Sequence, residues 1–276
     1  MILWMNGNYI SEDDAAISPF DHGYLYGLSF FEKFRTYKGQ VVLFQEHYHR
    51  LITKLNQFHI EMPYSVPEIL RVIKDLTKKA NNQDGLFYLT VSAGNNNLQM
   101  QFQSSYKEPN VCIIRREIFP GERGREKSAK WLEMKGTYTL HENRYLGSLE
   151  IEQLDNTEGF FLSQRGIITE GITSNVFFAK DGVLYTPSIA TGITPGITRQ
   201  WVINTAKQIG YRVVEDLFIR QDLEDAYECF VTNSIEELVP ISNIDNIHFL
   251  GKDGTIYQRL HQAYIDEILR TVKKGE

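Results

Sequence analysis

The sequence contains few cysteines and no long apolar segment. Only Cys112 and Cys229 occur among its 276 residues, which is too few for the disulfide framework of a small secreted protein and fits a reducing cytoplasm. The N-terminus lacks the basic region and apolar run of a secretory signal, and no stretch approaches the roughly 20 apolar residues of a membrane span. We therefore expect a soluble, cytoplasmic protein with no membrane partner.

A strong charge of either sign is also absent. The 29 basic and 35 acidic side chains give a net charge of −6, and a mildly acidic chain repels phosphate backbones, so we expect no nucleic-acid partner. Hydrophobic residues make up 42% and charged residues 23% of the chain, values typical of a globular protein rather than a disordered one. Because domains usually contain about 100–200 residues, the length suits two domains.

Several catalytic signatures are missing. No Gly-x-Gly-x-x-Gly follows a strand and no Gly-x-x-x-x-Gly-Lys-Ser/Thr occurs, so neither a dinucleotide site nor a P-loop is indicated. The sequence has no His-Glu-x-x-His, and His47 and His49 would diverge on a helix, so we expect no metal site. The absence of Gly-x-Ser-x-Gly disfavours a hydrolase.

The first half of the chain predicts a small α+β domain over residues 1–119. Its residue patterns indicate strands at 2–5, 86–93 and 111–118 and amphipathic helices at 46–58 and 66–80. A polar segment with two glycines, residues 120–127, is the expected linker to the second half.

The second half predicts a larger domain over residues 128–276, in which strands dominate. Strand patterns occur at 131–135, 159–163, 175–179, 183–186, 211–216 and 228–231. A helix is expected from Thr198 to Ile209, because Gly210 is a typical residue after a helix C-terminus. The two halves together predict the α/β (α+β) fold class.

A glycine- and proline-containing loop, residues 191–199, runs directly into the predicted helix at Thr198. The first backbone N–H groups of a helix have no partner within the helix and lie at the positive end of its dipole, so this helix start suits a phosphate. The alternative is a structural N-cap in which the glycines serve only the turn.

Two further segments contain polar side chains next to strands. Glu170 follows a β-branched run and precedes a glycine, a setting in which a carboxylate pairs with a buried cationic nitrogen and stays ionised; the alternative is a solvated turn glutamate. Asn233 and Ser234 end the predicted strand that begins at Glu228, where binding groups are often displayed. The alternative there is an ordinary polar turn.

These segments, with two others, resemble the class IV aminotransferases, the fold type IV enzymes that use pyridoxal 5′-phosphate. The two others are residues 18–27 with Phe31-Glu32 behind them, and residues 46–51. The resemblance covers nearly the whole chain. The family includes branched-chain aminotransferases, D-amino acid aminotransferases and 4-amino-4-deoxychorismate lyases, and the motifs are most similar to those of the lyases of Gram-positive bacteria.

The resemblance implies a two-domain fold with a mixed, barrel-like sheet in the larger domain, and a homodimer that acts on a small-molecule substrate. It implies that Glu170 pairs with the pyridine nitrogen of the cofactor. The residues expected at its phosphate are Arg50, Ile197, Thr198 and Ser234, and Asn233 is expected to contribute to cofactor binding. Those expected around the substrate are Tyr24, Phe31 and Tyr88.

The family also requires a lysine that bonds covalently to the cofactor and moves a proton at the substrate's α-carbon. No lysine occurs between Gly136 and Ala179, so Lys135 is the nearest one before Glu170 and is the expected catalytic residue. The segment after it is shorter than in relatives. The alternative is therefore a noncatalytic Lys135 at a strand end, with the family's lysine position deleted.

The function expected from the resemblance is a lyase that converts 4-amino-4-deoxychorismate to 4-aminobenzoate and pyruvate in folate synthesis. One alternative is an aminotransferase acting on D-amino or branched-chain amino acids. The altered lysine region motivates a third alternative, a family member that binds its cofactor or a partner without turnover.

Overall fold

A computed structural model of the chain divides into two compact units. The first contains Met1–Pro120 and Glu267–Glu276, and the second contains Gly121–Asp266. The structure describes residues 1–95, 104–118, 125–151 and 156–275.

The boundaries of these units differ in detail from the expected domains. The predicted larger domain extends to residue 276, whereas the last ten residues of the chain group with the first unit. Of the predicted linker 120–127, residues 120–124 lie outside the described residues.

The first unit contains a six-stranded antiparallel sheet in the order β2-β1-β6-β5-β3-β4. Its strands are β1 (Ile2–Met5), β2 (Asn8–Ser11), β3 (Ser29–Tyr37), β4 (Gln40–Val41), β5 (Gly85–Ser92) and β6 (Asn110–Glu117). Strand β3 has no predicted counterpart, although it lies next to β5 over seven residue pairs. Its alternation is masked by Glu32, a charged residue that is nevertheless buried.

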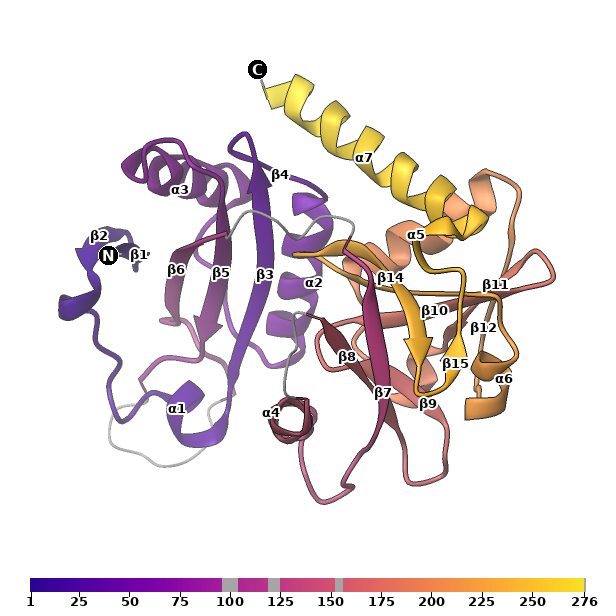
Figure 1. Cartoon of the computed structure of the whole chain (residues 1–276). Helices are drawn as coiled ribbons and strands as arrows, with labels where there is room; N and C mark the ends of the chain where they lie inside the picture. The colour runs from indigo at the N-terminus through magenta and orange to yellow at the C-terminus, as the bar shows by residue number, and fades with distance from the viewer. Residues whose placement is uncertain (96–103, 119–124, 152–155, 276) are drawn as a thin grey trace. The chain divides into compact units, whose positions relative to one another are not determined.

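Three helices accompany this sheet, α1 (His22–Tyr26), α2 (Phe44–Gln57) and α3 (Val66–Lys79). The predicted helices 46–58 and 66–80 are thereby confirmed. A capping box formed by Ser65 and Glu68 begins α3. The helices α2 and α3 lie beside the sheet (Figure 1) and bury apolar side chains against it. The core includes Phe34, Leu51, Leu55, Ile69, Ile73, Phe87, Leu89 and Ile113.

The second unit contains a nine-stranded mixed sheet in the order β12-β11-β10-β13-β14-β7-β8-β9, with β15 paired to β14. Its strands are β7 (Lys127–Glu133), β8 (Thr157–Leu162), β9 (Ile168–Gly171), β10 (Asn175–Lys180), β11 (Val183–Pro187), β12 (Arg212–Asp216), β13 (Glu228–Asn233), β14 (Glu237–Ile244) and β15 (Ile247–His248). An isolated bridge joins Ile167, just before β9, to Ile219, just after β12. The two ends of the sheet therefore approach each other, which gives the barrel-like core expected for this fold.

The helices of the second unit are α4 (Leu140–Glu150), α5 (Ile197–Gln208) and α6 (Arg220–Glu224), and α7 (Thr255–Gly275) continues into the first unit. Helix α4 begins with a capping box of Thr139 and Glu142. It packs closely on β7 and β8 through Gly147, where an added Cβ would lie 2.7 Å from Phe161 Cζ and 2.9 Å from Leu132 Cδ1. None of the described helices combines the length and apolar character needed to cross a membrane.

We predict that Gly147→Val destabilises the second unit, because Phe161 and Leu132 are themselves buried and have little room to move. Overpacking of this kind costs about 1–3 kcal/mol. Leu149→Val on the exposed face of the same helix is the matched control and is expected to cost less than about 0.5 kcal/mol. Urea denaturation of the two variants tests this, and equal stability would mean that α4 is not closely packed at Gly147.

Candidate active site

Glu170 is the most completely buried carboxylate among the predicted site residues. It lies on β9 and its side chain is 0% exposed. Arg144 Nη2 of α4 donates to Oε1 at 2.8 Å, and the backbone N–H of Thr194 donates to Oε2 at 2.9 Å. A buried charge needs such partners to remain in the fold. Glu170 is therefore not a solvated turn glutamate, and its cationic partner within the chain is Arg144.

The loop that contains Thr194 links Glu170 to the start of α5. Asn175 Nδ2 donates to Thr194 O at 2.9 Å and holds this loop against β10. Gly196 is the N-cap of α5, with no side chain capping the helix, and an added Cβ there would collide with Asn175 Oδ1. Thr194, whose N–H contacts Glu170, lies three residues before the start of α5. The loop therefore leads from Glu170 directly to the first N–H groups of the helix, those of Ile197 and Thr198.

The end of β13 lies beside Asn175, because Asn175 pairs with Thr232 in the sheet. The side chain of Asn233 is used within its own turn: Oδ1 accepts from the N–H groups of Ile235 and Glu236. In the part of the chain that the structure describes, the hydroxyl of Ser234 has no hydrogen-bond partner, and the buried Thr232 hydroxyl has none either. The hydroxyl of Ser234 therefore retains its hydrogen-bonding capacity, whereas that of Thr232 is enclosed by the protein.

Lys135 lies in the loop between β7 and α4, and its side chain is exposed. The buried Asn143 fixes this loop, since its Oδ1 accepts from Lys135 N at 2.8 Å and its Nδ2 donates to Lys135 O at 3.2 Å. The preceding Met134 sulfur lies 3.6 Å from the hydroxyl of Thr169, the neighbour of Glu170. The ammonium group of Lys135 has no partner among the described residues. Lys135 thus remains a candidate by position, without a contact that assigns it a role.

Arg50 belongs to the first unit, where it pairs with Glu32, and Glu32 is bonded in turn to His47. Arg50 Nε and Nη2 donate to the two oxygens of Glu32 at 2.8 and 2.6 Å, and His47 Nδ1 donates to Oε2 at 2.6 Å. Although burial alone raises the pKa of Glu32, these hydrogen bonds and charges lower it overall. The bidentate pair fixes the guanidinium of Arg50, which is still 24% exposed.

The three predicted substrate residues also lie in the first unit. Phe31 on β3 and Tyr88 on β5 are on the same face of its sheet, since Tyr88 pairs with Lys33 two residues after Phe31. Alternation places Glu32 on the opposite face. Tyr24 on α1 is 74% exposed and Phe31 is 45% exposed. None of the observed contacts assigns a ligand to these rings.

The motif at residues 18–27 has a structural function in the first unit. The buried Asp21 accepts from Gly23 N at 2.6 Å, Ser92 Oγ at 2.7 Å and Asn110 Nδ2 at 2.6 Å. It also lies at the N-cap of α1. Asp21 therefore fixes the short helix that presents Tyr24.

Sequence reasoning missed a second buried carboxylate, Glu158 on β8. It accepts from Ile172 N at 2.9 Å and Ser174 Oγ at 2.9 Å, and burial raises the pKa of its side chain despite the positive charge of Lys127. It holds the turn between β9 and β10, next to Glu170. No sequence signal separates it from an exposed strand-edge glutamate.

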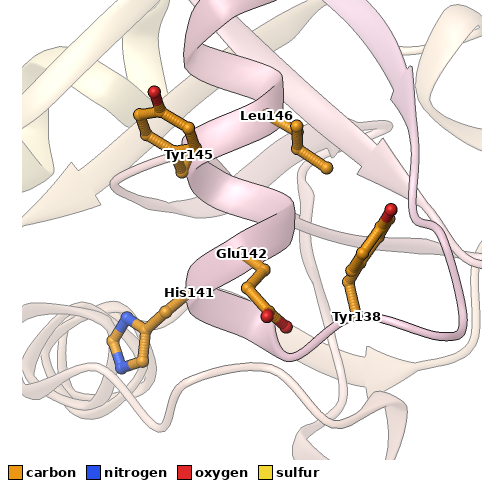
Figure 2. Close-up of a pocket in the computed structure, with 5 residues that line it drawn as sticks. All are labelled: Tyr138, His141, Glu142, Tyr145 and Leu146. Carbon is orange, nitrogen blue, oxygen red and sulfur yellow. The ribbon is translucent and has the colours of Figure 1, made fainter.

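A shallow hollow of about 380 Å³ lies along α4. Figure 2 shows the residues that line it, which are Tyr138, His141, Glu142, Tyr145 and Leu146. None of the predicted site residues is among them. The hollow lies on the same helix as Arg144, the partner of Glu170.

The residues of the second unit suit the parts of pyridoxal 5′-phosphate. The uncapped start of α5 and the unpartnered hydroxyl of Ser234 suit its phosphate. Glu170 suits the ring nitrogen, because its buried carboxylate accepts a hydrogen bond from a cationic nitrogen, as it does from Arg144 in this structure. Arg144 of α4 was not among the predicted site residues. Thr194 lies in the predicted loop 191–199, but its contact with Glu170 was not predicted.

We predict that Glu32 makes stability depend on pH in the acidic range. Its pKa is lower in the fold than the ordinary value of 4.5, so its stabilising effect is full above that value and is lost as pH falls through the folded pKa. Glu32→Gln should flatten the loss of unfolding free energy below about pH 4.5. The control is Glu46→Gln, an exposed position on α2. Parallel pH profiles for wild type and Glu32→Gln would contradict the assignment.

Comparisons with known proteins identify the family of the chain. Residues 29–244 match the family described as Amino-transferase class IV. The aminodeoxychorismate lyase of Bacillus subtilis (strain 168) is 34% identical, over 99% of this chain and 97% of its own length. A D-alanine aminotransferase of Listeria monocytogenes is 30% identical, over 98% and 97%.

Solved structures lead to the same family. The branched-chain amino acid aminotransferase of Escherichia coli has a TM-score of 0.82 at 26% identity, covering 96% of this chain and 93% of its own. A second branched-chain amino acid aminotransferase, solved with pyridoxamine 5′-phosphate, has a TM-score of 0.80 at 26% identity, covering 97% and 93%. The expected fold type IV is confirmed. The chain belongs to the class IV aminotransferase family.

Proposed function

We propose that the protein is a pyridoxal-phosphate-dependent lyase that converts 4-amino-4-deoxychorismate to 4-aminobenzoate and pyruvate in folate synthesis. The observation that carries the proposal is the buried carboxylate of Glu170, bonded to the loop that leads into the uncapped start of α5. The 34% identity to a lyase over nearly the whole chain supports the reaction chosen.

The cofactor is pyridoxal 5′-phosphate, which supplies an electron sink for charge that develops at the substrate's α-carbon. Glu170 accepts a hydrogen bond from the ring nitrogen and keeps a proton there. The N–H groups of Ile197 and Thr198 and the hydroxyl of Ser234 bind the phosphate. Arg50, whose guanidinium Glu32 fixes within the first unit, is the proposed phosphate-binding arginine.

Lys135 is the proposed nucleophile and proton carrier of the reaction. Its loop is anchored by Asn143, so its backbone position is defined while its side chain is free to move. Tyr24, Phe31 and Tyr88 contribute to substrate binding in the proposal.

The proposed enzyme acts as a homodimer in the cytoplasm. A mass of twice 32.0 kDa, measured by light scattering of the purified protein, would support that assembly.

An aminotransferase acting on D-amino or branched-chain amino acids is the second candidate. It is favoured by the D-alanine aminotransferase of Listeria monocytogenes at 30% identity and by the two branched-chain aminotransferase structures. The same cofactor residues serve both reactions, so only the substrate distinguishes them. The family member without turnover is the third candidate, motivated by the exposed, unpartnered side chain of Lys135.

We predict that borohydride traps the cofactor on Lys135. Protein incubated with pyridoxal 5′-phosphate should show a visible absorption band that borohydride removes, and peptide mass mapping should find the added pyridoxyl group on Lys135. Lys135→Ala should lose the band, whereas Lys130→Ala, an exposed lysine on β7, should keep it. A modified lysine elsewhere would refute the role of Lys135.

We predict that the loaded enzyme forms 4-aminobenzoate from 4-amino-4-deoxychorismate. Glu170→Gln should lower kcat about 100-fold or more, because a neutral amide does not hold a proton on the ring nitrogen. The comparison is amino transfer from D-alanine or L-leucine to 2-oxoglutarate under the same conditions. Amino transfer without formation of 4-aminobenzoate would favour the aminotransferase over the lyase. No reaction with any of these substrates would favour the family member without turnover.

A further inference from the structure

The carboxylate of Glu170 already has a cationic partner within the second unit. Arg144 Nη2 lies 2.8 Å from Glu170 Oε1, and the same nitrogen lies 2.8 Å from Thr194 Oγ1. The other oxygen, Oε2, accepts from Thr194 N at 2.9 Å. Each oxygen of the carboxylate is thus engaged by protein donors that lie 24 or more positions away in the chain.

Arg144 is held by one end of its guanidinium only. Both hydrogen bonds involve Nη2, while the buried Nε has no partner among the residues that the structure describes. The side chain is 24% exposed, in contrast to the fully buried Glu170. A bidentate pair would fix both groups, whereas this single-ended pair leaves Arg144 a route to solvent when another cation binds Glu170.

We propose that Arg144 is the cationic hydrogen-bond partner of Glu170 in the absence of cofactor, and that Arg144 and the ring nitrogen of the cofactor compete for this carboxylate. The inference rests on the proposed function, which assigns the ring nitrogen to Glu170. A guanidinium stays charged at all relevant pH values, and two cations at one buried carboxylate repel each other. Binding of the cofactor therefore requires Arg144 to leave Glu170.

In the protein without cofactor, Arg144 stabilises the buried carboxylate of Glu170. Glu170 alone would be an unpaired buried charge, which strongly destabilises a fold. Arg144 neutralises it, and the hydroxyl of Thr194 keeps the guanidinium in place. Only molecules in which Arg144 has left Glu170 then bind the cofactor. The apparent affinity equals the intrinsic affinity multiplied by the fraction of such molecules. Arg144 is therefore a residue that sets cofactor affinity and takes no part in the reaction itself.

The experiment measures equilibrium binding by the quenching of intrinsic fluorescence, with two probes. One probe is pyridoxal 5′-phosphate, and the other is its 1-deaza analogue, in which a carbon replaces the ring nitrogen. Arg144→Gln should bind pyridoxal 5′-phosphate about 10- to 100-fold more tightly than wild type, the range expected for removing a competing charge-assisted hydrogen bond. Its affinity for the deaza analogue should change less than about twofold, because a carbon does not compete for Glu170.

Two further variants keep the test decisive. Thr194→Val removes the hydroxyl that holds Arg144 but retains the N–H donor to Glu170 and the overall shape, so it should give a smaller gain with the same probe selectivity. Arg220→Gln, which removes a surface arginine of the second unit, should leave both affinities unchanged. Thermal unfolding without cofactor should show a lower Tm for Arg144→Gln than for Arg220→Gln, since Glu170 then lacks its cation.

The outcomes separate this inference from the proposed function. Equal or weaker binding of pyridoxal 5′-phosphate by Arg144→Gln and Thr194→Val, with wild type binding it, overturns the competition and leaves the proposed function standing. An equal gain in affinity for both probes also overturns the competition, because the smaller size of the new side chain, and not the loss of its charge, would then explain the gain. If folded wild type and folded variants all fail to bind pyridoxal 5′-phosphate, the proposed function and this inference fail together.

Discussion

The burial of one negative charge organises the second unit. Glu170 is completely enclosed, and a carboxylate in that position is stable only while charged and polar groups face it. The requirement explains why α4 brings Arg144 to β9 and why the loop before α5 directs the amide of Thr194 at the same side chain. Elements that are distant in the sequence are thus connected through a single functional group.

The close backbone approaches near Glu170 follow from the same arrangement. Gly196 leaves room for Asn175, which holds the Thr194 loop, and Gly147 lets α4 lie directly on Phe161 and Leu132. A side chain at either glycine would move the loop or the helix that contacts Glu170.

The first unit contains a different arrangement, because there the carboxylate of Glu32 orients Arg50, an arginine that remains partly exposed. In one unit a cation stabilises a buried acid, and in the other a buried acid orients a cation.

Local sequence patterns were sufficient for much of the fold and for part of the site. Apolar periodicity and caps predicted α2, α3 and α5 within about two residues, and the motif around Glu170 singled out a carboxylate that the structure buries completely. Strand β3 was missed, since the inward-facing Glu32 interrupts its apolar alternation. Arg144 was missed for a different reason: its partner lies on another element, and no local pattern distinguishes it from an exposed helical arginine.

A crystal structure of the protein with pyridoxal 5′-phosphate tests the central claim most directly. We expect the ring nitrogen within hydrogen-bonding distance of Glu170, the phosphate on the N–H groups of Ile197 and Thr198, and Arg144 displaced from the carboxylate. A cofactor bound elsewhere in the protein, or one bound beside α5 while Arg144 keeps its 2.8 Å contact with Glu170, would contradict it.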